Sequence, residues 1–295
     1  MAASAKPTIG ITVGDPSGIG PEIAQKAAAD SRVSDVCSPV LYGPPAGRSF
    51  PTGRISAESG RAAYDAIVSA VEDARAGRIA AIATAPINKE AFAAAELPWR
   101  GHTELLAHLT GALQVAMMFH SATLRVVLAT VHIPLAEVPR ALTRESLEAI
   151  ITLTASELPR FGWPSPRLAL AGLNPHAGEH GLMGAEEELV LVPAVEASRA
   201  RGITIEGPLP ADTVFVRAMR GEFDAVIACY HDQGLIPVKL VAFGQAVNVT
   251  LGLPIIRTSV DHGTAFDIAG RGAADPSSMI HAVLLAAKLA GSMKL

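Results

Sequence analysis

Three of the nine histidines in this chain follow apolar segments that have the composition of buried β-strands. The segments are residues 124–130, 167–173 and 224–229, and the histidines are His132, His176 and His231. Because the carboxyl ends of parallel strands meet at one edge of a sheet, the three side chains can converge there. Three imidazoles with an open coordination position suit a catalytic divalent metal such as zinc. Buried histidines that only form hydrogen bonds remain the alternative.

Residues 228–276 hold the densest group of polar side chains in apolar, glycine-rich surroundings. The polar residues are His231, Asp232, Lys239, Asn248, Arg257, Asp261 and His262. Where water is scarce, each polar side chain needs a metal, a substrate group or another side chain as its partner. The stretch therefore predicts one wall of an active site.

The sequence Gly101-His102-Thr103-Glu104 predicts the start of a helix that runs to Thr110, with Gly111 as its stop. His102 and Thr103 would lie in the first turn of this helix. The free backbone N–H groups and the helix dipole favour anions at that position. A helix cap with an incidental histidine is the other interpretation.

The elements that must position these residues alternate between strands and helices. Strands are expected at 6–13, 40–42, 79–84 and the three segments named above, and helices at 20–29, 56–76, 102–110, 143–158, 184–201 and 276–289. This rhythm predicts an α/β fold with a largely parallel sheet covered by helices on both faces. The GDPSG turn at 14–18 suits a backbone that approaches a ligand, although its spacing is not that of a Rossmann fingerprint and a structural turn remains possible.

Composition limits the classes of function. A hydrophobic fraction of 49% with 18% charged residues describes a folded protein, and a length of 295 residues favours about two domains. The net charge of -4 argues against non-specific nucleic-acid binding. The N-terminal MAASAKP lacks the apolar core of a signal peptide, and no apolar run is long enough to span a membrane. With two cysteines far apart and no CxxC pair, a cytoplasmic location is expected.

Nine motifs follow one another along the chain: GDPSGIGPE, TAPINK, GHTE, VHIPL, LNPHAGE, PADT, YHDQG, NVTLGLP and RTSVDHGTAFDIAGRG. In this order they closely resemble the 4-hydroxythreonine-4-phosphate dehydrogenase family of pyridoxal phosphate biosynthesis. The resemblance extends from about residue 8 to residue 289. It departs near residues 43–56, where the family usually has a longer segment, and this puts the periphery of the first lobe in doubt.

The resemblance implies a role for eight residues by motif position. The metal ligands fall on His132, His176 and His231, and the substrate contacts fall on His102, Thr103, Lys239, Asn248 and Arg257. The related isopropylmalate and isocitrate dehydrogenases have a similar HG-[ST]-A-x-DIAG segment associated with the dinucleotide. By that analogy the cofactor contacts are Gly263, Thr264 and Asp267, and His262 belongs to the same segment.

The resemblance also implies the architecture: two α/β/α lobes with largely parallel sheets around a central cleft, as in isocitrate and isopropylmalate dehydrogenases. Residues 1–110 and 258–295 would form the first lobe, on the cofactor side. Residues 111–257 would form the second lobe, on the metal and substrate side, which also carries the dimer interface. The family forms homodimers whose active site is completed at that interface.

The implied reaction oxidises the C3 hydroxyl of 4-phosphooxy-L-threonine with NAD or NADP. The β-keto acid then loses carbon dioxide and gives 3-amino-2-oxopropyl phosphate. One divalent ion, zinc, magnesium or cobalt, would assist both steps. Lys239 and Asp232 are the candidates for proton transfer, while the alternative role of Asp232 is to orient a metal-bound histidine.

Other functions compete with this interpretation. Similar proteins oxidise 4-phospho-threonate or phospho-erythronate, and these substrates share the phosphate group. A terephthalate cis-dihydrodiol dehydrogenase is disfavoured because the GHTE and RTS motifs, which such relatives tend to lose, are both present. A function as a non-catalytic small-molecule binding protein is also disfavoured, because it gives no reason for three histidines that each follow a strand.

Overall fold

The computed structural model describes residues 6–292, so the first five residues of the N-terminal segment discussed above lie outside the described part. The chain divides into two compact units. Unit 2 is Ala116–Ala246, and unit 1 comprises the residues before and after it. The chain returns to unit 1 at Val247, earlier than the boundary at residue 258 expected from the sequence, because residues 247–251 pair with a strand of unit 1.

The sheet of unit 1 has the strand order β2-β1-β3-β10-β9. Its strands are β1 (Thr8–Thr12), β2 (Ser38–Tyr42), β3 (Ala81–Thr84), β9 (Val247–Leu251) and β10 (Arg257–Ser259). Neighbouring strands are parallel, except that β9 runs antiparallel to β10. The parallel strands β1 and β3 are buried along nearly their whole length, as expected for a sheet covered on both faces.

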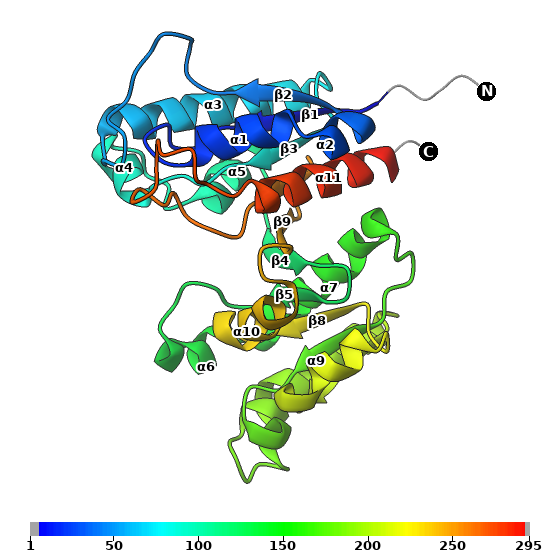
Figure 1. The fold of residues 1–295 in the computed structure, drawn as a ribbon. Coiled ribbons are helices and arrows are strands. Elements are labelled where there is room, and N and C mark those ends of the chain that lie inside the picture. Colours follow the sequence, from blue (N-terminus) through cyan, green and yellow to red (C-terminus); the bar gives the residue numbers. More distant parts are fainter. Residues whose placement is uncertain (1–5, 293–295) are drawn as a thin grey trace, which may run out of the picture. The chain divides into compact units, whose positions relative to one another are not determined.

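Helices cover both faces of this sheet (Figure 1). One group is α1 (Gly20–Ala28), α2 (Ser31–Val36) and α11 (Ser277–Ser292), and the other is α3 (Ala57–Arg75), α4 (Lys89–Ala94) and α5 (His102–Thr110). In α3 the buried residues recur at helical spacing, and the Ser56 side chain accepts a hydrogen bond from the Ser59 amide at its start. Ile67 of α3, Ile82 of β3 and Phe92 of α4 meet in the core between them.

The sheet of unit 2 has the order β4-β5-β8-β6-β7. Its strands are β4 (Ala116–His120), β5 (Arg125–Leu128), β6 (Leu168–Ala171), β7 (Ile205–Leu209) and β8 (Ala225–Ala228). The strands β5, β8, β6 and β7 are mutually parallel, whereas β4 and β5 form an antiparallel pair. The carboxyl ends of β5, β8 and β6 therefore lie next to one another.

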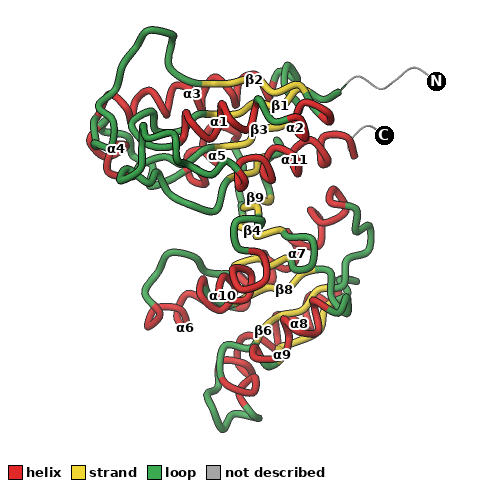
Figure 2. Tube along the Cα trace, in the orientation of Figure 1, coloured by secondary structure: helices red, strands yellow, loops and turns green. Residues whose placement is uncertain are grey.

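The helical segments of unit 2 lie on both faces of its strands (Figure 2). They are η1 (Leu135–Glu137), α6 (Val138–Ala141), α7 (Arg144–Glu157), η2 (Leu158–Phe161), η3 (Pro175–Gly178), η4 (Glu187–Leu191), α8 (Val192–Ala200), α9 (Ala211–Met219) and α10 (His231–Ala242). Alternate strand residues such as Val126 and Val226 pack with Val214 of α9 and Leu235 of α10 in one core.

The predicted α/β class with largely parallel strands is confirmed, but several elements differ from expectation: the strands β4, β7, β9 and β10 were not expected, and two helical segments also differ. The helix expected over 184–201 begins with a π-helical segment, η4, before α8. The helix α10 was not expected either, because Gly234 and Pro237 normally argue against a helix. Gly234 is needed there, since a Cβ atom would come within 2.6 Å of the Leu128 side chain.

Two further observations concern the helices and the cysteines. Within residues 6–292 no helix combines the length and the apolar character required to cross a lipid bilayer. Cys37 and Cys229 are both buried free thiols. Burial raises the pKa of the Cys229 thiol to about 12, so this cysteine is a packing residue and not a nucleophile.

Candidate functional site

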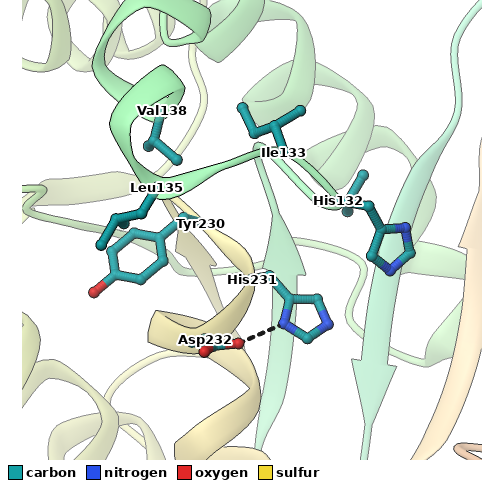
Figure 3. Close-up of a pocket in the computed structure, with 8 residues that line it drawn as sticks. His132, Ile133, Leu135, Val138, Tyr230, His231 and Asp232 are labelled. Carbon is teal, nitrogen blue, oxygen red and sulfur yellow. Dashed lines mark hydrogen bonds and ion pairs between the residues drawn. The ribbon is translucent and has the colours of Figure 1, made fainter.

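His132 and His231 lie side by side at the edge of unit 2 where β5 and β8 end (Figure 3). Their ring centroids are 5.5 Å apart, and the rings are inclined by 43°. They line a pocket of about 280 Å³ whose other walls are largely apolar. The other lining residues are Val131, Ile133, Leu135, Val138, Tyr230 and Asp232.

Asp232 holds the His231 ring in place. Its Oδ1 atom lies 2.7 Å from His231 Nδ1, and Figure 3 shows the carboxylate and the His132 ring on opposite sides of His231. A carboxylate that fixes one ring nitrogen leaves the other available to a ligand. This geometry supports the alternative interpretation of Asp232, in which it orients a histidine and does not itself transfer protons.

His176 lies after β6, in a segment of unusual backbone geometry. Its φ angle is 52°, and the φ angles of the next five residues are also positive. Its Nδ1 atom lies 2.8 Å from Glu179 Oε2, so this histidine too has one ring nitrogen engaged by a carboxylate. Among residues 6–292, no group of three or more His, Cys, Asp or Glu side chains is arranged to hold a metal ion. The structure thus pairs His132 with His231, and His176 as a third ligand stays a prediction.

The chemistry of these donors nevertheless fits a divalent metal. Imidazole nitrogen is a preferred ligand of zinc, cobalt and similar ions. His231 and His176 each have a carboxylate on Nδ1, which fixes the ring and leaves Nε2 as the coordinating atom. The donor types therefore fit the expected ion, although the structure brings only two of the three histidines together.

In unit 1, Arg257 is buried at the start of β10, with 3% of its surface exposed. Its guanidinium donates to Thr84 Oγ1 from Nη2 at 2.7 Å and from Nε at 3.1 Å, and Nη1 donates to Thr250 Oγ1 at 3.0 Å. In the described part of the chain no acidic side chain forms an ion pair with it. Burial lowers the pKa of Arg257 to about 9. A buried cation held only by neutral hydroxyls is ready to accept an anion.

His102 and Asn248 contribute unsatisfied polar atoms to the same unit. As predicted, His102 begins α5, which ends at Thr110 before the left-handed Gly111. Neither His102 Nε2 nor Asn248 Oδ1 has a hydrogen-bond partner among residues 6–292, although both atoms are buried. Burial, and secondarily the charge of Arg257, lowers the pKa of His102 well below 6.5. Such orphaned atoms mark places where a ligand or water completes the hydrogen bonding.

The predicted substrate residues are divided between the units. His102, Thr103, Asn248 and Arg257 belong to unit 1, and Lys239 is an exposed residue of α10 in unit 2. Burial is the main cause of the lowered pKa of His102, and the charge of Arg257 in the same unit contributes to it. The contribution of Lys239 remains a prediction.

The predicted cofactor segment packs against the GDPSG turn. The Ile19 amide donates to the Thr264 carbonyl at 3.0 Å, and a Cβ atom at Gly18 would lie 2.7 Å from the same oxygen. Gly18 thus allows the two backbones to touch. Gly263 and Asp267 are exposed on this segment, as a ligand-binding role would require. Their role in cofactor binding stays a prediction.

The shortened segment, residues 43–56, is a loop that contacts both of these elements. The Gly53 amide donates to the Ser17 carbonyl at 2.8 Å, next to the GDPSG turn. At Gly270, a Cβ atom would lie 2.8 Å from Thr52 Cγ2. The loop is therefore part of the surroundings of the predicted cofactor segment and not a remote periphery.

Sequence reasoning missed Thr84 and Thr250, which hold Arg257. Each is a hydroxyl residue within a buried strand, where threonine is common and carries no signal of function. The available signals were the position of Thr84 at the start of the TAPINK motif and that of Thr250 within the NVTLGLP motif.

Residues 17–286 match the family model described as "Pyridoxal phosphate biosynthetic protein PdxA". The chain belongs to the PdxA family. This confirms the resemblance drawn from the motifs. A 4-hydroxythreonine-4-phosphate dehydrogenase of Desulforapulum autotrophicum is 47% identical, with 96% of this chain and 95% of the relative covered. That alignment extends over 323 positions, more than this chain's 295 residues, so the relative has residues that this PdxA-family chain lacks.

Other PdxA-family relatives bear a second name. A D-threonate 4-phosphate dehydrogenase of Cupriavidus necator is 45% identical, with 96% of this chain and 97% of the relative covered. Among solved structures, a 4-hydroxythreonine-4-phosphate dehydrogenase of Klebsiella pneumoniae is 40% identical with a TM-score of 0.89, covering 98% of this chain and 99% of that one. A β-decarboxylating dehydrogenase of Thermococcus kodakarensis, 16% identical with a TM-score of 0.52, covering 92% of this chain and 80% of that one, shares the fold. The expected fold class is confirmed.

Proposed function

We propose that this protein is an NAD(P)-dependent dehydrogenase that oxidises 4-phosphooxy-L-threonine at C3. Decarboxylation of the product would give 3-amino-2-oxopropyl phosphate, a step in pyridoxal phosphate biosynthesis. The observation that carries the proposal is the buried Arg257, which has no acidic partner among the described residues and lies near a neutral His102. A fixed buried cation requires an anionic ligand, and this substrate has a phosphate and a carboxylate.

Substrate binding falls to the residues around Arg257. The planar guanidinium suits an oxyanion, and a neutral His102 can donate a hydrogen bond to an anion or accept one from a hydroxyl. Asn248 offers an amide whose Oδ1 atom is buried without a partner. Thr103, in the first turn of α5, adds a hydroxyl beside the free amides of that turn. Lys239 would supply a second cation.

His132, His176 and His231 would hold the divalent ion, zinc, magnesium or cobalt. When bound, such an ion would polarise the oxygen on C3, which favours loss of the hydroxyl proton during oxidation and lets the C3 ketone draw electrons from the carbon–carbon bond that breaks during decarboxylation. Asp232 fixes the ring of His231, and Glu179 fixes the ring of His176. These carboxylates set which ring nitrogen faces the ion.

Oxidation also requires that one proton leave the C3 hydroxyl while NAD or NADP takes the hydride. Lys239 and Asp232 are the proton-transfer candidates. The 2.7 Å pairing of Asp232 with His231 favours Lys239 for this role. Gly263, Thr264 and Asp267 would contact the dinucleotide, since their segment is irregular and partly exposed.

The protein would act as a homodimer in the cytoplasm, with residues of both protomers completing the active site. The support for a dimer is an apolar stripe on the outer side of α10. Ile236, Leu240 and Phe243 are 65%, 83% and 80% exposed, far more than expected for three neighbouring apolar side chains. The buried free thiols agree with a reducing compartment.

A second candidate substrate is a 4-phosphorylated threonate or erythronate. It is favoured by the relative named D-threonate 4-phosphate dehydrogenase, whose identity of 45% is close to the 47% of the first relative. The two substrate types share the phosphate, the carboxylate and the C3 hydroxyl, and they differ at C2, which carries an amine or a hydroxyl.

The test is a substrate panel with metal-stripped protein. Phosphorylated hydroxythreonine and phosphorylated threonate are each supplied with NAD or NADP and with added zinc, magnesium or cobalt. Formation of reduced nicotinamide that depends on hydroxythreonine phosphate and on the ion supports the proposal. Turnover of threonate phosphate alone would replace it with the second candidate. Ligand binding without turnover of either substrate would contradict both.

A further inference from the structure

The strand ends that precede His132 and His231 are tied together at Cys229. The carbonyl of Cys229 accepts two hydrogen bonds from Thr130, one from the amide at 3.2 Å and one from the hydroxyl at 2.7 Å. Thr130 and Cys229 each lie two residues before a histidine. This double contact therefore fixes the separation of the backbones from which the paired rings project.

On the other side of β8 the backbone pairing with β6 stops. The last paired residues are Leu170 and Ile227. Beyond them, the side chain of Gln233 from α10 joins the two strand ends. Its Oε1 atom accepts from the Cys229 amide at 2.6 Å, and its Nε2 atom donates to the Gly172 carbonyl at 2.6 Å. The Gln233 amide thus replaces a backbone connection at the point where the strands part.

The primary amide of Gln233 matches both partners, because its oxygen accepts and its nitrogen donates. The Cys229 N–H needs an acceptor and the Gly172 C=O needs a donor, and both residues are buried. Glutamate has no donor when ionised, and leucine has neither donor nor acceptor. A buried backbone group left without a partner costs about 1–3 kcal/mol, so the site selects for glutamine.

The hydrogen bonds form one continuous path across three strand ends: from Thr130 to Cys229, to Gln233 and to Gly172. Past these strand ends the chain leads to His132, His231 and His176. We propose that Gln233 is a positioning residue that sets the distance between the His176 segment and the His132–His231 pair. The inference rests on the metal site of the proposed function and adds the element that aligns it.

The experiment measures Co²⁺ binding to the metal-stripped full-length protein by its visible absorption spectrum, in wild type and in Gln233→Leu and Gln233→Glu. Both variants are expected to bind Co²⁺ about 10- to 100-fold more weakly, as is usual when a residue that orients a ligand is lost. Their spectra should also change shape, because His132 and His231 remain paired while the third donor is displaced. Urea denaturation checks that each variant is folded.

Two further variants sharpen the test. Thr130→Val removes the hydroxyl bond at the other strand end but keeps the backbone bond, so it should change the Co²⁺ spectrum even if both Gln233 variants fail to fold. Gln245→Leu replaces an exposed glutamine after α10 and should leave affinity and spectrum at wild-type values.

The outcomes separate this inference from the proposed function. Folded Gln233 variants with wild-type affinity and spectrum overturn the inference alone. An equal loss of affinity in Gln245→Leu also overturns it, because the effect would not depend on the Gln233 bridge. A wild-type protein that binds no Co²⁺ overturns the metal site of the proposed function and the inference with it.

Discussion

Thr84 Oγ1 accepts two hydrogen bonds from Arg257, 2.7 Å from Nη2 and 3.1 Å from Nε. It also donates to Ser259 Oγ at 3.0 Å, so its hydroxyl is fully used. Thr84 ends β3 and Arg257 begins the parallel strand β10, which fixes the orientation of the guanidinium. The buried guanidinium of Arg257 is therefore oriented by the neutral side chain of Thr84.

Replacing Thr84 with Val should weaken both substrate binding and the fold. The variant leaves two buried N–H groups of Arg257 without their acceptor, which costs about 1–3 kcal/mol. We expect the free energy of unfolding in urea to fall by that amount and KM for the phosphorylated substrate to rise about 10-fold, with a smaller change in kcat.

Two variants control for loss of a buried hydroxyl. Thr84→Ser keeps the acceptor and should restore KM. Thr154→Val removes another fully buried hydroxyl, which bonds only to its own helix at Ile150, and should leave KM unchanged. A KM for Thr84→Val equal to that of wild type would show that Arg257 needs no such support.

The neutral His102 makes stability depend on pH. In the folded protein its pKa lies well below 6.5, whereas the unfolded chain takes up the proton near pH 6.5. Below that pH the unfolded state binds more protons, so the free energy of unfolding decreases as the pH falls, by up to about 1.4 kcal/mol per pH unit. Urea denaturation of His102→Gln between about pH 7 and pH 5 should show a smaller decrease than wild type.

The exposed His180 provides the control for this pH series. His180→Gln should follow the wild-type curve. His281, whose pKa is also lowered by burial, acts in the same direction in every variant and does not affect the comparison. Equal slopes for wild type and His102→Gln would contradict the assignment of a His102 that is neutral in the folded protein.

Substitutions of Asp232 distinguish its two roles. If it orients His231, Asp232→Ala should weaken Co²⁺ binding about 10- to 100-fold, and Asp232→Asn, which keeps an acceptor, should weaken it much less. If it transfers protons, Asp232→Asn should abolish turnover at unchanged Co²⁺ affinity. Parallel measurements of Co²⁺ affinity and kcat decide between the roles.

The apolar stripe on α10 predicts a specific change in assembly. Leu240→Glu places a charge in a surface that a dimer would bury, so the mass measured by sedimentation should fall to that of one chain. The control is Leu113→Glu, at a leucine of unit 1 that is even more exposed, which should leave the mass unchanged. A wild-type protein that sediments as a monomer would show that the dimer proposal is wrong.

Much of the fold and of the candidate site could be predicted from the sequence, because strands and the polar residues that follow them are recognisable from short local patterns. The α/β order, the helix that starts at His102 and the placement of His132 and His231 after neighbouring strands follow from short patterns of residue type. The partners of Arg257 could not be predicted in this way, because Thr84 is 173 residues away in the chain and threonine is ordinary in a strand. The helix α10 could not be predicted because Gly234 disfavours a helix. That glycine is required by the close approach of α10 to Leu128 of β5, a contact between distant parts of the chain.

The backbone around His176 was also beyond prediction. Nothing in the letters LNPHAGEH, residues 173–180, requires four non-glycine residues with positive φ. The Asn174 side chain donates to Glu186 at 2.8 Å and to Glu187 at 2.9 Å, and the Asn174 amide donates to Glu187 at 2.7 Å. Contacts between residues a dozen positions apart therefore determine the conformation of the segment.

The left-handed backbone angles of the His176 segment also carry a free-energy cost. His176, Ala177, Glu179 and His180 each occupy a backbone region that costs about 1–3 kcal/mol for residues other than glycine. Any rearrangement that returns even one of them to an extended conformation releases part of this energy. A ligand that draws His176 out of its present place would recover part of this cost but would also have to break the contacts of Asn174 with Glu186 and Glu187, so its apparent affinity would reflect both terms.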